Sequence, residues 1–289
     1  MSWRTVVISR RCKLDLNMGY MVIRGEEIKR IFIDEIAVVV IENPAVSITG
    51  CLLNELANKK ARVIFCNEKR SPYAELQPYH GSYDCSHKLR TQIKWTDEQK
   101  GLIWTAIVAE KIKNQSRLLA ELGHEDESRL LSSYIDELLF NDESNREGHA
   151  AKVYFNALFG KDFSRGNENH INAALNYGYG IILSAINREV TINGINTQLG
   201  LCHDNMFNPY NFSCDLMEPF RVLIDRKVIS LKHTKFESEE KRSILSLLNA
   251  RFLINDTQQT LLNAIKIYVK SVIDAVNAGD DSLIRFAEI

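Results

Sequence analysis

The first 75 residues alternate between apolar and polar positions. In residues 12–17, charged and amide side chains alternate with Leu14 and Leu16, and a period of two is typical of a strand with one buried face. Further strands are predicted at residues 5–9, 20–24, 27–33, 37–41 and 62–66, with one helix at 48–58. The pattern therefore predicts a small β-rich domain over residues 1–75.

A different pattern begins near residue 91. Residues 67–90 contain Pro72, Pro78 and Gly81 and show no sustained period, so a linker is predicted at 76–90. From residue 91 onward the apolar positions recur every three or four residues, as in amphipathic helices. Helices are predicted around 103–112 and at 128–139, 145–159, 168–188, 215–230, 237–254 and 257–277. The sequence thus predicts an α+β protein with a larger all-α domain at 91–289.

The composition is that of an ordinary globular protein. The 289 residues are 45% hydrophobic and 25% charged, which excludes collagen-like and disordered chains. None of the six cysteines has CxxC spacing, so we expect buried thiols in a reducing compartment, not a four-thiolate zinc site. The sequence shows no signal peptide and no apolar run of the roughly 18 residues that a membrane helix needs. A cytoplasmic location without membrane contact is therefore predicted.

The charge is unevenly distributed along the chain. The formal net charge of -1 argues against a wholly basic nucleic-acid coat protein, yet residues 1–90 carry a net +4. In the acidic remainder, residues 221–235 hold Arg221, Arg226, Lys227, Lys232 and Lys235 against one acidic residue. Such a run is usually a solvated helix face, but beside a metal site it could also neutralise DNA phosphates.

Glu147 is the first candidate for chemistry. It precedes a stretch with small residues at 148, 150 and 151, which would leave room for an ion beside the carboxylate. The alternative is a carboxylate in the first turn of a helix, where the macrodipole favours negative charge. The sequence alone leaves both interpretations open.

A second candidate site lies in residues 200–221. His203 follows a glycine-bearing turn, and Asp215 and Glu218 would share one helix face at a spacing of three. Imidazole and carboxylate ligands suit Mg²⁺, Mn²⁺ or Zn²⁺. Asp215 could equally be an N-cap, because Pro219 is typical of a helix start. A metal site and a capped helix are about equally supported here.

Four segments together resemble a known family, the CRISPR adaptation integrase that inserts new spacers into a repeat array. The segments are EGHAAKVYF (147–155), INAALNYGY (171–179), GLCH (200–203) and DLMEPFR (215–221), and their order and the two-domain layout match across essentially the whole chain. The compact length and the string NYGY look most like the type II version, found beside Cas9-type effectors.

The resemblance implies a set of site residues. Glu147, His203 and Glu218 would be the metal ligands and catalytic residues, holding Mg²⁺ or Mn²⁺, although many family members have Asp at the position of Glu218. Asp215 would support the site by capping a helix or orienting a ligand. Candidate DNA contacts in the basic segment are Arg221, Lys227, Lys232 and Lys235, and Asn172, Tyr177 and Tyr179 are expected to pack around the site.

The resemblance also implies an activity and partners. A 3′-hydroxyl of a short DNA fragment would attack a phosphodiester of the double-stranded repeat, and the same centre could cleave branched DNA. The implied partners in this antiviral defence would be a second copy of the chain, paired through the β-rich domain, a small second adaptation subunit and a Cas9-type effector. The alternative is a non-catalytic, DNA-architectural subunit. A helical di-metal oxidoreductase is disfavoured, since it would need a second Glu-x-x-His pair and the chain has only one.

Overall fold

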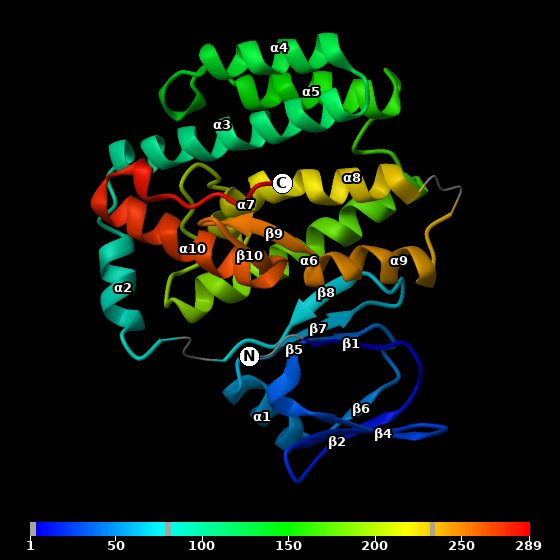
Figure 1. Cartoon of the computed structure of the whole chain (residues 1–289). Coiled ribbons are helices and arrows are strands. Elements are labelled where there is room, and N and C mark those ends of the chain that lie inside the picture. The colour runs from blue at the N-terminus through cyan, green and yellow to red at the C-terminus, as the bar shows by residue number, and fades with distance from the viewer. Residues whose placement is uncertain (1–3, 79–81, 232–234) are drawn as a thin grey trace. The chain divides into compact units, whose positions relative to one another are not determined.

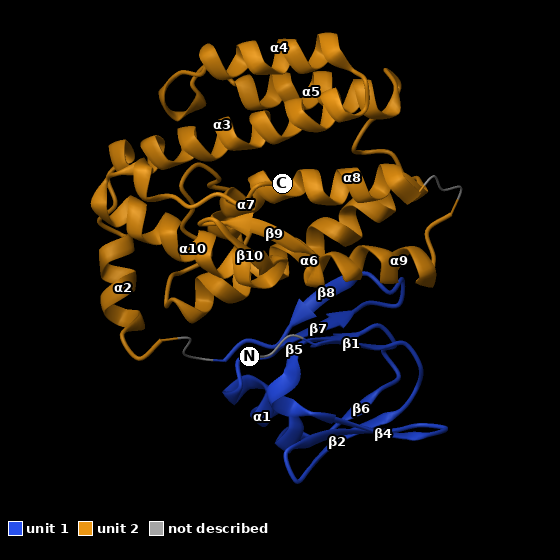
Figure 2. Cartoon of the chain, in the orientation of Figure 1, with its two compact units in different colours: residues 1–81 blue, residues 82–289 orange. Residues whose placement is uncertain are grey.

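The computed structural model describes residues 4–78, 82–231 and 235–289. The chain divides into two compact units, residues 1–81 and residues 82–289 (Figure 2). The first unit is β-rich and the second is largely helical, which confirms the predicted fold class. The candidate DNA contact Lys232 lies outside the described residues.

The first unit contains two four-stranded sheets, ordered β1-β5-β7-β8 and β4-β3-β2-β6. Its elements are β1 (Arg4–Ile8), β2 (Lys13–Asn17), β3 (Tyr20–Arg24), β4 (Ile28–Phe32), the 3-10 turn η1 (Ile33–Glu35), β5 (Ile36–Ile41), β6 (Ser47–Ile48), α1 (Gly50–Asn58), β7 (Arg62–Cys66) and β8 (Pro72–Glu75). The short strands β6 and β8 were not predicted, because two to four residues are too few to show a period.

The core of this unit follows from the hydrophobic pattern. Strand β5 is an uninterrupted apolar run and all six of its residues are buried between its parallel partners β1 and β7. Strands β2 and β3 form the predicted hairpin, whose turn places Met18 and Gly19 at positive φ of 48° and 79°. Such a turn matches the twist of the paired strands, and Gly19 adopts this conformation without a steric penalty.

The second unit is built from helices with one short hairpin (Figure 1). Its elements are α2 (Cys85–Gln92), α3 (Asp97–Glu121), α4 (Glu125–Asp136), η2 (Phe140–Asp142), α5 (Arg146–Phe159), α6 (His170–Ile192), α7 (Asn211–Met217), η3 (Glu218–Phe220), α8 (Arg221–Leu231), α9 (Ser238–Leu245), η4 (Ser246–Asn249), β9 (Arg251–Ile254), β10 (Thr257–Thr260), α10 (Leu261–Ala278) and η5 (Asp281–Leu283).

Helix α3 is the long element on which the site is built. Thr96 and Gln99 form a capping box at its N-terminus, which satisfies backbone donors that would otherwise lack partners. The helix buries Ile103, Trp104 and Ile107, and the same buried set continues to Lys111. Helices α4 and α5 lie along it (Figure 1). A lysine is thus carried into the interior directly after an apolar stretch of the helix.

Two predicted helices are wrong in part. Residues 237–254 and 257–277 were each expected to be one helix, but the end of the first range forms β9 and the start of the second forms β10, which pair as an antiparallel hairpin. The hairpin turn is Asn255–Asp256, with both residues at positive φ of 49° and 56°. Asn and Asp tolerate this conformation better than other non-glycine residues, and an Asn-Asp pair is a turn signal that the helical interpretation overlooked.

The predicted linker is also too long. Helix α2 begins at Cys85, inside the 76–90 range that contains Pro78 and Gly81.

All six cysteines are described and none forms a disulfide, but Cys51 and Cys202 are exposed, so the prediction that all thiols are buried is wrong. Within the described ranges, no helix is both long and apolar enough to cross a membrane.

Candidate metal and active site

Glu147 lies in the first turn of α5. The preceding turn is held by side chains: Asp142 accepts hydrogen bonds from the amides of Arg146 and Glu147 at 2.7 and 3.1 Å. Asn145, at a left-handed φ of 52°, accepts from the Gly148 amide at 3.3 Å. The first-turn position fits the macrodipole interpretation, yet the Glu147 carboxylate also borders a cavity, so the two interpretations do not exclude each other.

His203 is held in place by Asp215. The Asp215 carboxylate, fully buried, accepts hydrogen bonds from the amides of Leu201, Cys202 and His203 at 2.5, 3.3 and 3.1 Å. It also contacts His203 Nδ1 at 2.6 Å, and this hydrogen bond raises the pKa of His203 although burial opposes the rise. Asp215 therefore orients the loop and the imidazole. Of the two supporting roles expected for it, capping a helix or orienting a ligand, these contacts match the second.

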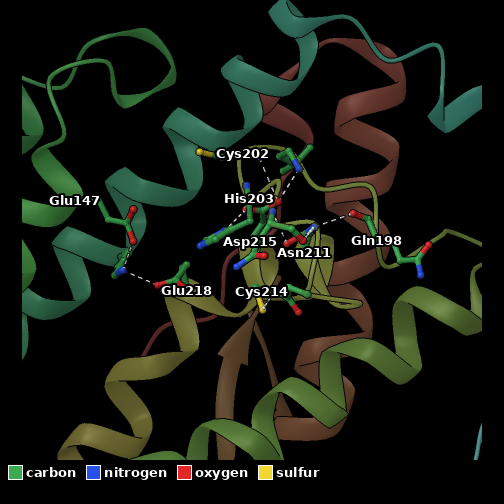
Figure 3. Close-up of polar contacts among 12 residues, drawn as sticks. Glu147, Gln198, Cys202, His203, Asn211, Cys214, Asp215 and Glu218 are labelled. Carbon is green, nitrogen blue, oxygen red and sulfur yellow. Dashed lines mark hydrogen bonds and ion pairs between the residues drawn. The ribbon is translucent and has the colours of Figure 1, made fainter. Parts of the chain in front are cut away.

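The prediction that Asp215 caps a helix is wrong. Helix α7 begins at Asn211, so Asp215 lies within it, and Pro219 lies in the 3-10 turn η3 that follows. Asn211 donates to the carbonyls of Gln198 and Asn205, both at 3.1 Å, and so ties the start of α7 to the loop before it. A helix start four residues earlier than expected turns Asp215 inward toward that loop (Figure 3).

Gly200 allows the loop to pass close to Asp215. A Cβ atom at this position would lie 2.3 Å from the His203 carbonyl oxygen and 2.7 Å from Asp215 Oδ2. Both distances are well below van der Waals contact, and the first involves backbone that cannot rotate away. Only glycine fits here without moving His203 or its partner.

Glu218 lies between two cations. Its Oε1 accepts from Arg221 Nε at 2.8 Å, and its Oε2 is 2.5 Å from Lys111 Nζ. Burial alone would raise the pKa of Glu218, but the two cations outweigh it and lower that pKa to about 2. The same Lys111 Nζ is 2.5 Å from Glu147 Oε1. One buried ammonium thus bridges the two predicted glutamate ligands.

The three predicted ligands border one cavity of about 220 Å³. Glu147 comes from α5, His203 from the loop before α7, and Glu218 from η3, and Figure 3 shows Glu147 and Glu218 directed toward one another. The cavity is also lined by Lys111, Gln115, Ala151, Phe155, Arg165, Tyr179, Arg221 and Asp225. Residues 71 positions apart in the sequence therefore meet at one concave, charged surface.

The cavity lining also includes a second polar cluster, around Asp225. Its buried carboxylate accepts hydrogen bonds from Tyr154 Oη at 2.9 Å and from Tyr179 Oη. Burial raises the pKa of Asp225 to about 6, although the two hydroxyls and nearby guanidinium groups oppose the rise. The guanidinium carbons of Arg165 and Arg221 lie over the Tyr179 ring, 5.3 and 4.7 Å from its centroid. Two cationic side chains are thus positioned at the cavity by one tyrosine.

Comparison with known proteins identifies the family. Residues 5–266 match the family model described as CRISPR associated protein Cas1. The chain belongs to the Cas1 family. It is 32% identical over 295 residues to "CRISPR-associated endonuclease Cas1" of Neisseria meningitidis, covering 100% of this chain and 97% of the relative.

Solved structures show the Cas1 fold in other settings. A casposase bound to an integration product superposes with a TM-score of 0.77 at 16% identity, covering 97% of this chain and 92% of that one. A Cas6-RT-Cas1–Cas2 complex gives a TM-score of 0.75 at 16% identity, covering 97% of this chain and 36% of the larger one. At these identities the likeness concerns the fold alone.

The side chains at the cavity fit the divalent metal that Cas1 membership implies. Two carboxylates already enclose a cation, and because Asp215 engages His203 Nδ1, Nε2 is the nitrogen that could hold a metal. Among the described residues, no three His, Cys, Asp or Glu side chains are grouped closely enough to hold an ion as they stand. The Lys111 ammonium is the group that lies between the two glutamates.

The predicted DNA contacts fall in different places. Arg221 is half-buried at the cavity, paired with Glu218 and stacked on Tyr179. Lys227 is partly exposed on α8, and Lys235 is exposed and 3.2 Å from Glu237. The prediction for these residues stands untested, but Arg221 differs from the two lysines because it belongs to the site itself.

Sequence reasoning missed Lys111 and Arg165. A signal for Lys111 existed, since a lysine within the apolar face of a long helix needs a buried partner. Arg165 lies between two predicted helices and donates to Asn172 Oδ1 at 2.5 Å and Asn176 Oδ1 at 2.6 Å. Nothing in its local sequence distinguishes it from an ordinary loop arginine.

Proposed function

We propose that this Cas1 family member is a metal-dependent DNA integrase and endonuclease, which inserts short DNA fragments as new spacers into a CRISPR repeat array. The observation that carries the proposal is the meeting of Glu147, His203 and Glu218 at one cavity, with Asp215 fixing the imidazole. Two carboxylates and one imidazole match the ligand preference of Mn²⁺ and Mg²⁺.

Glu147, His203 and Glu218 would hold the metal. A bound Mg²⁺ or Mn²⁺ would polarise the attacked phosphodiester and stabilise charge that develops on its oxygens. Glu218 suits this role because its cationic neighbours keep its carboxylate ionised, and His203 because Asp215 fixes its ring. Carboxylate–histidine pairs of this kind orient metal ligands.

The arginines at the cavity would bind the DNA backbone. Arg165 and Arg221 are positioned by Tyr179 and face the same cavity as the ligands, and a planar guanidinium suits phosphate oxygens. With the phosphate held there, a 3′-hydroxyl of the fragment would attack and the 3′-hydroxyl of the repeat would leave. One phosphodiester is exchanged for another, so the reaction needs no nucleotide cofactor.

The proposed partners follow from the need for two joining events at each repeat. A homodimer paired through the β-rich unit would supply two active sites, and a small second adaptation subunit would set their separation. The same fold occurs in a Cas6-RT-Cas1–Cas2 complex, which supports the second subunit, and in a casposase bound to an integration product, which supports DNA as a partner. More specifically, we propose that the protein works in a type II CRISPR system, together with its Cas9-type effector.

A plasmid-joining assay tests the activity. The full chain would be mixed with short duplex DNA, a supercoiled repeat plasmid, Mn²⁺ or Mg²⁺, and the second subunit added or omitted. Glu147→Ala and His203→Ala are expected to slow joining by at least about a hundredfold, because each removes a ligand of the charge-stabilising centre. Glu143→Ala and His149→Ala, which change exposed residues nearby, should join normally.

The same assay distinguishes the proposed enzyme from the alternative, a DNA-architectural subunit. Such a protein would bind DNA through its basic residues without chemistry of its own. If Glu147→Ala and His203→Ala joined DNA at the wild-type rate, the proposed metal site would be wrong. Binding of the repeat duplex with no joining under any metal condition would favour the architectural role.

A further inference from the structure

Lys111 is the most unusual residue at the cavity. Its side chain is 8% exposed and extends from the buried face of α3, one turn after the apolar Ile107 and Val108. A lysine in this position costs free energy unless its ammonium is paired. The two partners it finds, Glu147 and Glu218, are the proposed metal ligands.

The geometry of this contact resembles metal coordination. Glu147 Oε1 and Glu218 Oε2 come from different elements and both lie 2.5 Å from one nitrogen, Lys111 Nζ. Oxygen ligands surround Ca²⁺ at about 2.3–2.6 Å and Mg²⁺ at about 2.0–2.1 Å. Both carboxylates already converge on one cation, so a divalent ion held by Glu147 and Glu218 would need the space that Nζ now fills.

We propose that Lys111 is a positioning residue that holds the place of the divalent cation. Its ammonium keeps the two glutamates together before the metal binds, and it must move aside when the metal enters. Lys111 therefore competes with the metal and lowers its affinity. This inference rests on the proposed metal ligation.

Lysine suits this role better than the other cation at Glu218. Arg221 contacts the opposite oxygen, Oε1, and its planar group also lies over Tyr179, so two contacts fix it in place. Lys111 carries a compact charge on a flexible stem, and the cavity of about 220 Å³ gives the ammonium room to move. Arg221 can thus stay with Glu218 while Lys111 leaves.

Calorimetric titration with Mn²⁺, in the absence of DNA, tests the proposal on the full chain. Lys111→Met keeps much of the stem but removes the charge, so it should bind Mn²⁺ roughly tenfold more tightly than the wild type. Without metal, the same variant should unfold at a lower temperature, because two glutamates lose their shared cation. Mn²⁺ should then raise its unfolding temperature by more than it raises that of the wild type.

Controls distinguish this inference from the function on which it rests. Lys113→Met, on the exposed side of the same helix and paired with Glu110, should leave Mn²⁺ affinity unchanged. Lys111→Gln, which is neutral but polar, should repeat the tighter binding if Lys111→Met folds poorly. Wild-type or weaker Mn²⁺ affinity in both Lys111 variants, with binding lost in Glu147→Ala and His203→Ala, would overturn the place-holder role alone. Unchanged affinity in Glu147→Ala and His203→Ala would overturn the metal site itself.

Discussion

Two buried carboxylates border the same cavity and behave in opposite ways. Glu218 is 2% exposed and Asp225 is 1% exposed, so both lose nearly all contact with water. The pKa of Glu218 is nevertheless lowered to about 2, whereas the pKa of Asp225 is raised to about 6. Equal burial therefore does not decide the charge of an acidic side chain.

The difference lies in the neighbours of the two groups. Glu218 directly contacts two cations, Lys111 and Arg221, which favour its ionised form more than burial disfavours it. Asp225 directly contacts two tyrosine hydroxyls, which satisfy its oxygens without supplying a full charge. Glu218 is thus suited to hold a metal, and Asp225 to fix the tyrosine that carries two arginines.

The largest effect on stability and on DNA joining should come from removing the charge of Glu218. Glu218→Gln leaves the buried Lys111 and the half-buried Arg221 with one carboxylate fewer, which should lower the free energy of unfolding at neutral pH by about 3 kcal/mol. Joining should fall by at least about a hundredfold, since a ligand is lost. Urea unfolding and the plasmid-joining assay measure the two effects. Asp225→Asn is the matched change, and an equal loss of joining in both variants would contradict the division of roles.

A smaller effect should follow from changing the support of His203. In Asp215→Asn, an amide nitrogen replaces one of the two oxygens that accept the loop amides and the imidazole, so the ring loses its fixed orientation. We expect Mn²⁺ affinity to fall by about ten- to a hundredfold, measured by calorimetry. Asp204→Asn, at an exposed neighbour of His203, is the control and should bind Mn²⁺ normally. Normal binding by Asp215→Asn would show that the loop holds His203 without it.

The smallest effect on activity, and a distinctive one on pH, should come from Asp225→Asn. The folded-state pKa of Asp225, about 6, lies above its unfolded value of 3.8, so the folded state binds this proton more tightly. Its contribution to stability is fully present below the unfolded pKa and is lost as the pH rises through about 6. Relative to the variant, the wild type should gain up to about 3 kcal/mol between about pH 7 and pH 4.

Urea unfolding of both proteins across this pH range measures the gain. Taking the difference between wild type and variant removes the titration of groups that both share, including Glu218. The groups facing Asp225 are Tyr154, Tyr179, Arg165 and Arg221. A difference that stays constant with pH would mean that the two hydroxyls and two guanidinium groups cancel the effect of burial.

Much of the fold could be predicted because the spacing of apolar positions within a short stretch of sequence indicates whether that stretch is a strand or a helix. Strands β3 and β7 were predicted with their observed bounds, since short alternating or continuous apolar runs end at clear turn residues. The hairpin β9–β10 was missed because four-residue strands embedded between helices give too short a signal. Its Asn255–Asp256 turn was the only local clue.

The site residues also fall into those that could be predicted from the sequence and those that could not. The resemblance to the family supplied Glu147, His203 and Glu218, and the structure places all three at one cavity. The role of Lys111 could not be derived, because its partners lie 36 and 107 positions away in the sequence. Pairings over such distances depend on how α3 packs against α5 and η3, which no local pattern encodes.

Gly200 has a consequence for anyone who wishes to re-engineer this protein. With the His203 carbonyl 2.3 Å from where a Cβ would stand, position 200 has no spare volume, and libraries that vary it would mostly yield misassembled sites. A few residues later, Met206 and Phe207 are 86% and 84% exposed and can be exchanged without displacing anything. One loop thus offers a position that requires glycine and, a few residues on, a stretch open to directed variation.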